Sequence, residues 1–175
     1  STIASTMTVS GSNSHYDGTT NGNNVLSIGN TAGVLATLTV QAGGWVDTYQ
    51  MQMGNIGNSD VTVTGAGSKL TVSNRFQIGR DGTPSAILTV ADGGLVRTDL
   101  LQFGEGGYTG SGYVHMAAGG ILAVLGDKTA NPFVNGGLFS FSGNPTSEIQ
   151  YDAGTGFVNM TGAILDTDYT LTYSA

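Results

Sequence analysis

The sequence predicts an all-β fold, a parallel β-solenoid of about 25 residues per coil, from three observations. Glycine returns at a fixed interval of 25 residues, at Gly29, Gly54, Gly79 and Gly104. The 175 residues include 29 glycines, and only 10% are charged. Between the glycines, Val, Ile, Leu and Met alternate with Thr and other polar residues, which is typical of half-buried strands joined by tight turns. No segment shows the apolar period of a helix.

The first strand of each predicted coil is an apolar, polar, apolar triplet followed by a glycine corner. Successive side chains of a strand point to opposite faces, so the apolar pair points inward and the central Thr or His points outward. Four such triplets occur, at 38–40, 61–63, 88–90 and 114–116.

The second strand of each coil ends in a related tetrapeptide: MQMG at 51–54, FQIG at 76–79 and LQFG at 101–104, with LSIG at 26–29. Strands of successive coils lie about 4.8 Å apart, so an inward position must be apolar in every coil. One inward stack should contain Leu26, Met51, Phe76 and Leu101, and its neighbour Ile28, Met53, Ile78 and Phe103. The closing glycine is expected to adopt a positive φ or to be too crowded for a β-carbon.

Two regions interrupt the repeat. Within the coils of residues 1–126, residues 10–24 are polar and rich in Gly and Asn, which predicts a loop projecting from the column. This loop is either a solvated excursion or a partner contact made by His15, Tyr16 and Asp17. Residues 127–175 lose the spacing and are expected to form a C-terminal β-rich cap of hairpins in the same structural unit. Their alternating pairs are Phe139 with Phe141, Ile149 with Tyr151, and Leu171 with Tyr173.

Charge and cysteine content exclude several classes of function. The net charge of −7 removes the electrostatic attraction that drives nucleic-acid binding. The absence of cysteine excludes disulfides and thiolate metal sites. No run approaches the roughly 18 apolar residues of a membrane span, and the first residues lack the layout of a signal peptide. We therefore expect no nucleic-acid partner and no membrane insertion of this chain.

Catalytic, cofactor and metal residues are not predicted, and we expect no enzymatic activity. The acids are dispersed over the coils and are expected to be solvated turn residues: Asp47, Asp60, Asp81, Asp92, Asp99 and Glu105. His15 and His115 are too far apart along the column for a shared metal, and His115 is expected to be an outward strand residue. Asp166 and Asp168 are either ordinary turn residues or weak calcium ligands.

Polar side chains recur at outward positions. Gln52, Gln77 and Gln102 either form a ladder of stacked amides or are simply polar outward residues. Threonine also recurs outward, at Thr39, Thr62 and Thr89, but one threonine per coil is too sparse to favour binding of ice or sugar. Residues 159–161 fit the sequon for N-glycosylation, which is a weak signal.

The stretch GAGSKLTVSNRFQIGRDGTPSAILTVADGGLV, residues 65–96, resembles the autotransporter and PEP-CTERM-associated repeat, and the likeness extends over roughly residues 25–125. The closing TGAILDTDYTLTYSA is similar to the segment that precedes the sorting signal of such proteins. The resemblance implies a right-handed parallel β-helix, export to the bacterial cell surface or extracellular space, and an adhesive or structural role.

Two functions from different classes follow. The first is a structural or adhesive extracellular protein that self-associates, end to end or laterally, as the subunit of a surface layer, fibre or stalk. The second is a carbohydrate-binding or polysaccharide-active β-helix, whose partners would be surface glycans. A shallow groove lined by Trp45, Tyr49 or Tyr108 would favour the second.

Overall fold

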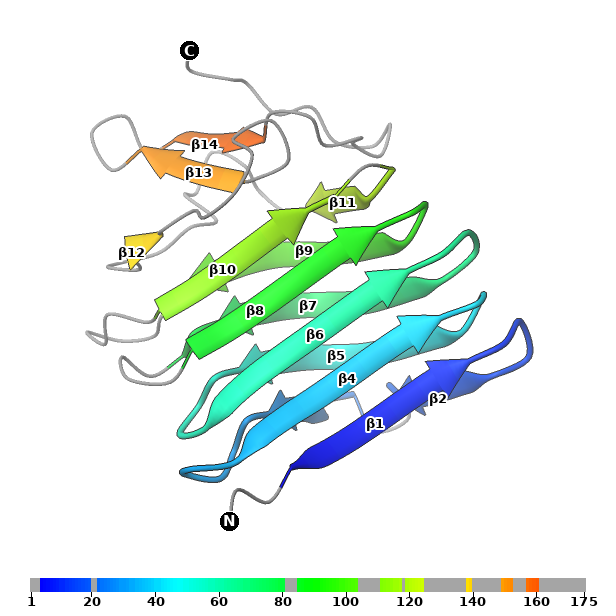
Figure 1. Ribbon diagram of the computed structural model, residues 1–175, viewed down its shortest axis with the longest axis horizontal. Helices are drawn as coiled ribbons and strands as arrows, with labels where there is room; N and C mark the ends of the chain where they lie inside the picture. The colour runs from blue at the N-terminus through cyan, green and yellow to red at the C-terminus, as the bar shows by residue number, and fades with distance from the viewer. Residues whose placement is uncertain are drawn as a thin grey trace.

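The protein is a parallel β-solenoid in which each coil adds one strand to each of two sheets (Figure 1). The computed structural model describes residues 4–19, 22–80, 85–103, 111–117, 119–124, 138–139, 149–152 and 157–160. Equivalent positions of successive coils lie about 26 residues apart, which confirms the predicted repeat. Helices are absent from the described residues, so none of these residues forms a helix that could cross a membrane.

The first sheet contains six parallel strands in the order β1-β4-β6-β8-β10-β12. Their bounds are β1 Ser5–Ser10, β4 Leu35–Gln41, β6 Asn58–Thr64, β8 Ser85–Ala91, β10 Ser111–Met116 and β12 Leu138–Phe139. Alternation along β4 buries Ala36, Leu38 and Val40 and turns Thr37 and Thr39 outward. This is the pattern predicted for the first strand of each coil.

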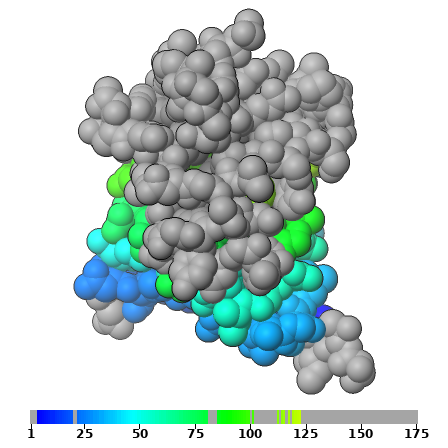
Figure 2. Space-filling view, turned by 90° about the vertical axis from the view of Figure 1, so that its left-hand side faces the viewer, coloured from blue at the N-terminus to red at the C-terminus, as the bar shows by residue number. Residues whose placement is uncertain are grey.

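The second sheet has the order β11-β9-β7-β5-β2, and β3 also pairs with β5. The bounds are β2 His15–Gly18, β3 Val25–Ile28, β5 Trp45–Met53, β7 Lys69–Ile78, β9 Leu95–Phe103 and β11 Ile121–Val124. In Figure 1 the first sheet runs across the front and the second returns behind it while the chain climbs from the N-terminus, so the coil is right-handed. Figure 2 shows the coils stacked in chain order from blue to green.

Residues 10–24, expected to be one projecting loop, contain a strand of the column. Within this segment β2 pairs in parallel with the first half of β5, and β3, which begins after the segment, pairs with the second half of β5. The insertion that lengthens the first coil is therefore confined to residues 19–24, between these two strands. The prediction of a loop was wrong because the sequence HYDG of β2 lacks the alternation of apolar and polar residues that indicates a strand. Instead, backbone pairing with β5 holds these residues in a strand.

The interior of the column contains the predicted apolar stacks. Leu26, Met51, Phe76 and Leu101 are aligned by the register of β3, β5, β7 and β9. The last three are fully buried, whereas Leu26 in the first coil is only partly buried. The neighbouring stack aligns Ile28, Met53 and Ile78, all buried, with the backbone of Phe103 in register.

The second sheet bends between its two halves. The register shifts between Thr48 and Gln50 of β5, and an equivalent shift occurs in β7. Val46 and Thr48 point inward before the shift and Met51 points inward after it, so the phase of the alternation changes by one residue. Such a bulge bends the strand without interrupting the sheet.

The closing glycines explain the fixed interval in the sequence. Gly29, Gly54 and Gly79 have φ values of 83°, 65° and 64°, which confirms the predicted positive φ. A β-carbon at Gly29 would also collide with the carbonyl oxygen of Gly57 in the next coil. Gly104, the fourth member of the series, lies outside the described residues.

Only short pieces of the predicted C-terminal cap are described. The strand β12 adds to the first sheet beside β10. The strands β13, Ile149–Asp152, and β14, Phe157–Met160, pair antiparallel. The remaining residues of 127–175, including Phe141, Asp166, Asp168, Leu171 and Tyr173, lie outside the described residues.

Candidate functional site

Three side chains from successive coils form a stack on the outer surface of the second sheet. Trp45 begins β5 and Lys69 begins β7, each directly after a glycine-rich turn, and His15 begins β2. The parallel register pairs His15 with Trp45 and Trp45 with Lys69. Because residues paired in register point the same way, the three side chains lie in one outward row.

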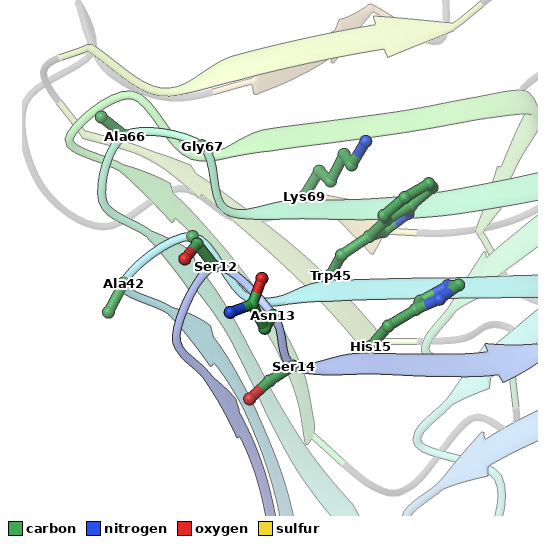
Figure 3. A pocket seen from close by; sticks show the side chains of 10 residues that line it. Ser12, Asn13, Ser14, His15, Ala42, Trp45, Ala66, Gly67 and Lys69 are labelled. Carbon is green, nitrogen blue, oxygen red and sulfur yellow. The ribbon is translucent and has the colours of Figure 1, made fainter.

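Trp45 lies in the middle of this stack, with both faces of its ring covered (Figure 3). The rings of His15 and Trp45 are stacked, with centroids 4.4 Å apart and an angle of 20° between their planes. From the next coil, Lys69 Nζ lies 3.3 Å from the centroid of the Trp45 ring. The cation is attracted by the electron-rich face of the indole. The indole therefore presents only its edge to a ligand.

Asp47 orients the two rings. Its Oδ1 accepts a hydrogen bond from Trp45 Nε1 at 2.6 Å, and its Oδ2 accepts one from His15 Nε2 at 3.0 Å. Asp47 was predicted to be a solvated turn residue, but it lies within β5 and is engaged by both rings. The sequence did not reveal this contact because it depends on the pairing of β2 with β5.

Asp17 lies beside Asp47 in the register of β2 and β5, so two carboxylates occupy equivalent positions in successive coils. The side-chain hydroxyl and the backbone amide of Thr19 both donate to Asp17 Oδ1, at 2.6 and 2.8 Å. These hydrogen bonds hold the pKa of Asp17 below its ordinary value, since they favour the charged form. All three predicted partner residues are exposed: His15 and Asp17 lie on the outer surface, and Tyr16 lies at an inward position, paired with Val46.

An open hollow of about 510 Å³ lies beside the aromatic stack, where the turns of three successive coils meet (Figure 3). The first coil contributes Ser12, Asn13 and Ser14 with His15, the second contributes its turn up to Trp45, and the third its turn up to Lys69. Lys69 and His15 are the described lining residues that can carry a positive charge, and none of the described lining residues has a carboxylate. The hollow therefore suits a polar ligand with a negative charge.

Of the three aromatic residues predicted to line a groove, Trp45, Tyr49 and Tyr108, the structure places one beside the hollow. Trp45 lines the hollow, but Tyr49 lies half-buried at the bulge of β5 and is not among the lining residues. Tyr108 lies outside the described residues. Lys69, Asn13 and Ser12 were missed, although the alignment of GGWV, GSKL and GGLV already placed Lys69 at the position of Trp45 in the next coil.

The row of glutamines differs from its expected exposure. Gln52 pairs with Gln77, and the backbone of Gln102 continues the row. Gln77 is fully buried and Gln52 is 8% exposed, so these side chains are not solvated surface residues. Arg80 lies against Gln52, with Nη1 3.3 Å from Gln52 Oε1 and 3.1 Å from Asn55 Oδ1. The Arg80 guanidinium thus donates a hydrogen bond to the side-chain oxygen of Gln52.

The remaining predicted polar residues are dispersed. Asp92 is exposed in a turn and Asp99 is exposed on β9, while His115 is half-buried on β10 beside Thr89. Burial raises the pKa of Asp60, which lies on β6. Among the described residues, no three His, Asp or Glu side chains lie close enough to hold one metal ion. Asp81 and Glu105 lie outside the described residues, and only the backbone of Asn159 is described.

Comparison of the chain with protein-family models, with curated proteins and with solved structures found no match.

Proposed function

We propose that the protein is a structural, adhesive building block of the bacterial cell surface, which associates end to end with further β-solenoid coils to form a fibre, stalk or layer. The observation that carries this proposal is the exposure of interior positions in the first coil. The likeness of residues 65–96 to repeats of exported surface proteins supports the extracellular setting.

The first coil exposes side chains whose equivalents are buried one coil further on. Met7 pairs with Leu38 and Tyr16 pairs with Val46, and both partners are fully buried. Met7 is only partly buried, and Tyr16 is 36% exposed. The end of the described column therefore presents part of an apolar interior, which a further coil would cover.

Backbone groups are available at the same end. Among the described residues, β1 is an edge strand of the first sheet, and β2 and β3 form the edge of the second. An edge strand presents unpaired N–H and C=O groups that can extend the sheet into another chain. A smaller hollow of about 210 Å³ lies at this end, lined by Ser5, Ser27 and Ala36 among others. A docked coil would fill it.

Low charge on the first sheet supports close packing. Its described outward side chains include Thr8, Thr39, Thr62 and Thr89 in one row. Asp60 is the one acidic side chain among the residues of β1, β4, β6 and β8. Two such faces would meet with little electrostatic repulsion despite the net charge of −7.

The end-to-end contact is tested by placing a charge at the exposed interior. We expect the unaltered chain to form concentration-dependent assemblies, and Met7→Lys to abolish them because the lysine would be desolvated in the contact. Thr62→Lys adds the same charge to the middle of the first sheet and should still assemble end to end. Sedimentation velocity and electron microscopy measure assembly, and circular dichroism verifies that each variant is folded.

Two results would refute the contact. One is an unaltered chain that stays monomeric at high concentration in every buffer. The other is a folded Met7→Lys variant that assembles as readily as Thr62→Lys.

A second candidate function, carbohydrate binding, is favoured by the hollow beside Trp45. Its polar lining can bind hydroxyl groups, although the covered indole faces cannot stack on a sugar ring.

A further inference from the structure

We propose that the hollow beside Trp45 binds an acidic sugar residue of an extracellular polysaccharide, with Lys69 as the residue that recognises its carboxylate. This inference concerns the side of the column and does not depend on the end-to-end contact.

Charge is the first argument for an acidic ligand. The chain has a net charge of −7, with five Lys and Arg residues in total. Lys69 nevertheless lines the hollow together with His15, and the part of the lining that the structure describes includes no carboxylate. Among the described residues, Lys69 forms no ion pair, and its ammonium contacts the ring of Trp45. A cation held in place by an aromatic ring retains hydrogen-bond donors for an incoming carboxylate.

The shape and lining of the hollow favour a sugar over a small inorganic anion. The lining spans the turns of three coils, which corresponds to roughly 10 Å along the column. Hydroxyl and amide groups of Ser12, Asn13 and Ser14 lie at one end, and the edge of Trp45 and the methyl group of Ala66 provide apolar surface. A sugar ring presents hydroxyl groups and C–H groups to match both kinds of surface. The volume of about 510 Å³ is that of an ordinary small-molecule site.

Asp47 holds the rings of Trp45 and His15 in place, and its negative charge does not line the hollow where the acidic ligand would bind. Its carboxylate is occupied by Trp45 Nε1 and His15 Nε2 and is not part of the lining. Asp47 is thus a positioning residue that holds the rings against each other, and Trp45 in turn holds the Lys69 ammonium. The four residues form one connected unit across three coils.

The single tryptophan of the chain makes the test direct, because Trp45 is the only indole fluorophore. The chain is titrated, dilute enough to be monomeric, with an oligogalacturonate, and separately with a neutral oligosaccharide of the same length. We expect a saturable change in tryptophan fluorescence with the acidic oligosaccharide alone, and binding that weakens as salt is added. Isothermal titration calorimetry measures the same binding without relying on the fluorophore.

Variants identify the residue responsible. Lys69→Met removes the charge while retaining a long side chain over Trp45, and it should raise the dissociation constant about tenfold or more. Lys69→Arg keeps the charge and should bind within a fewfold of the unaltered chain. Arg97→Met is the matched control, since Arg97 is an outward cation on β9 that does not line the hollow.

The proposal is overturned by any of three results. These are no saturable binding of the acidic oligosaccharide by either method, equal binding of the neutral one, or a folded Lys69→Met variant that binds as tightly as Arg97→Met. None of them bears on assembly through the end of the column, which is measured separately.

Discussion

The first coil and the coil that follows it place side chains at the same inward positions but bury them to different extents. Met7 and Leu26 are partly buried, whereas their register partners Leu38 and Met51 are fully buried. A solenoid residue is enclosed by the coils above and below it, so burial depends on position in the array as well as on the local sequence. Identical substitutions should therefore have different effects at the end and in the interior.

The largest expected difference is between two leucines of one inward stack. Leu101→Ala removes a fully buried side chain and should lower the free energy of unfolding by about 3 kcal/mol, through lost burial and the cavity left behind. Leu26→Ala removes a partly exposed side chain of the first coil and should cost about half as much. Urea denaturation at a concentration where the chain is monomeric measures both.

Equal losses for the two leucine variants would mean that the first coil is enclosed as completely as the interior. A larger loss for Leu26→Ala would contradict the comparison outright. Repeating the measurement on the assembled form gives a sharper test, because end-to-end contact should raise the cost of Leu26→Ala and leave that of Leu101→Ala unchanged.

A second comparison concerns two glycines of the first coil that both have positive φ. Gly33 has a φ of 71°, and a β-carbon there would meet nothing within 4 Å beyond its chain neighbours, so Gly33→Ala should cost about 1 kcal/mol of backbone strain. Gly29 has a φ of 83°, and its β-carbon would collide with the backbone of Gly57 in the next coil. Gly29→Ala should cost about 2 kcal/mol or more. Thermal unfolding of both variants tests whether contact between coils, and not φ alone, selects glycine.

The sequence was sufficient to predict the coil because the inward positions are constrained in every repeat. Phe76 and Met51 can differ in shape, but both must be apolar, and the glycine at the same corner must remain. The Trp45 cluster could not be predicted in full, because His15 reaches it only through the pairing of β2 with β5. That pairing is imposed by the neighbouring strand and leaves no periodic pattern in the sequence HYDG. The burial of Gln77 was not predicted. The alternation of apolar and polar residues along a strand indicates which face of the sheet a side chain points to, but not which other residues cover that side chain.

A smaller effect is expected for the hydroxyl contact that joins the first two coils on the first sheet. Thr37 Oγ1 donates to Thr6 Oγ1 at 3.0 Å across the register of β1 and β4. Single and double replacements by valine should give a coupling energy of about 0.5 kcal/mol, because both groups are open to water. The double-mutant cycle removes the separate gain in strand propensity that valine brings. A coupling of zero would mean that this contact adds nothing to the attachment of the end coil.

The smallest expected effect is the change in stability when an aspartate is replaced by asparagine, which should have opposite signs in the interior, at Asp60, and in the end coil, at Asp17. Burial raises the pKa of Asp60 in β6, so the folded state disfavours its charged form, and Asp60→Asn should stabilise the protein at neutral pH by less than about 1 kcal/mol. That gain should vanish as the pH falls below about 3.9, where the carboxyl is protonated in the folded and unfolded states alike.

The pKa of Asp17 in β2 is lowered by its hydrogen bonds from Thr19. Asp17 therefore contributes stability above the ordinary pKa of an aspartate, and this stability is lost as the pH falls through the folded-state pKa. Asp17→Asn should therefore destabilise at neutral pH. Melting temperatures of the unaltered chain and both variants are measured from about pH 3 to about pH 7. At the upper end the two variants should differ from the unaltered chain in opposite directions, and both differences should shrink as the pH falls. A destabilising Asp60→Asn at neutral pH would show that burial of this carboxylate is offset by interactions that favour its charge.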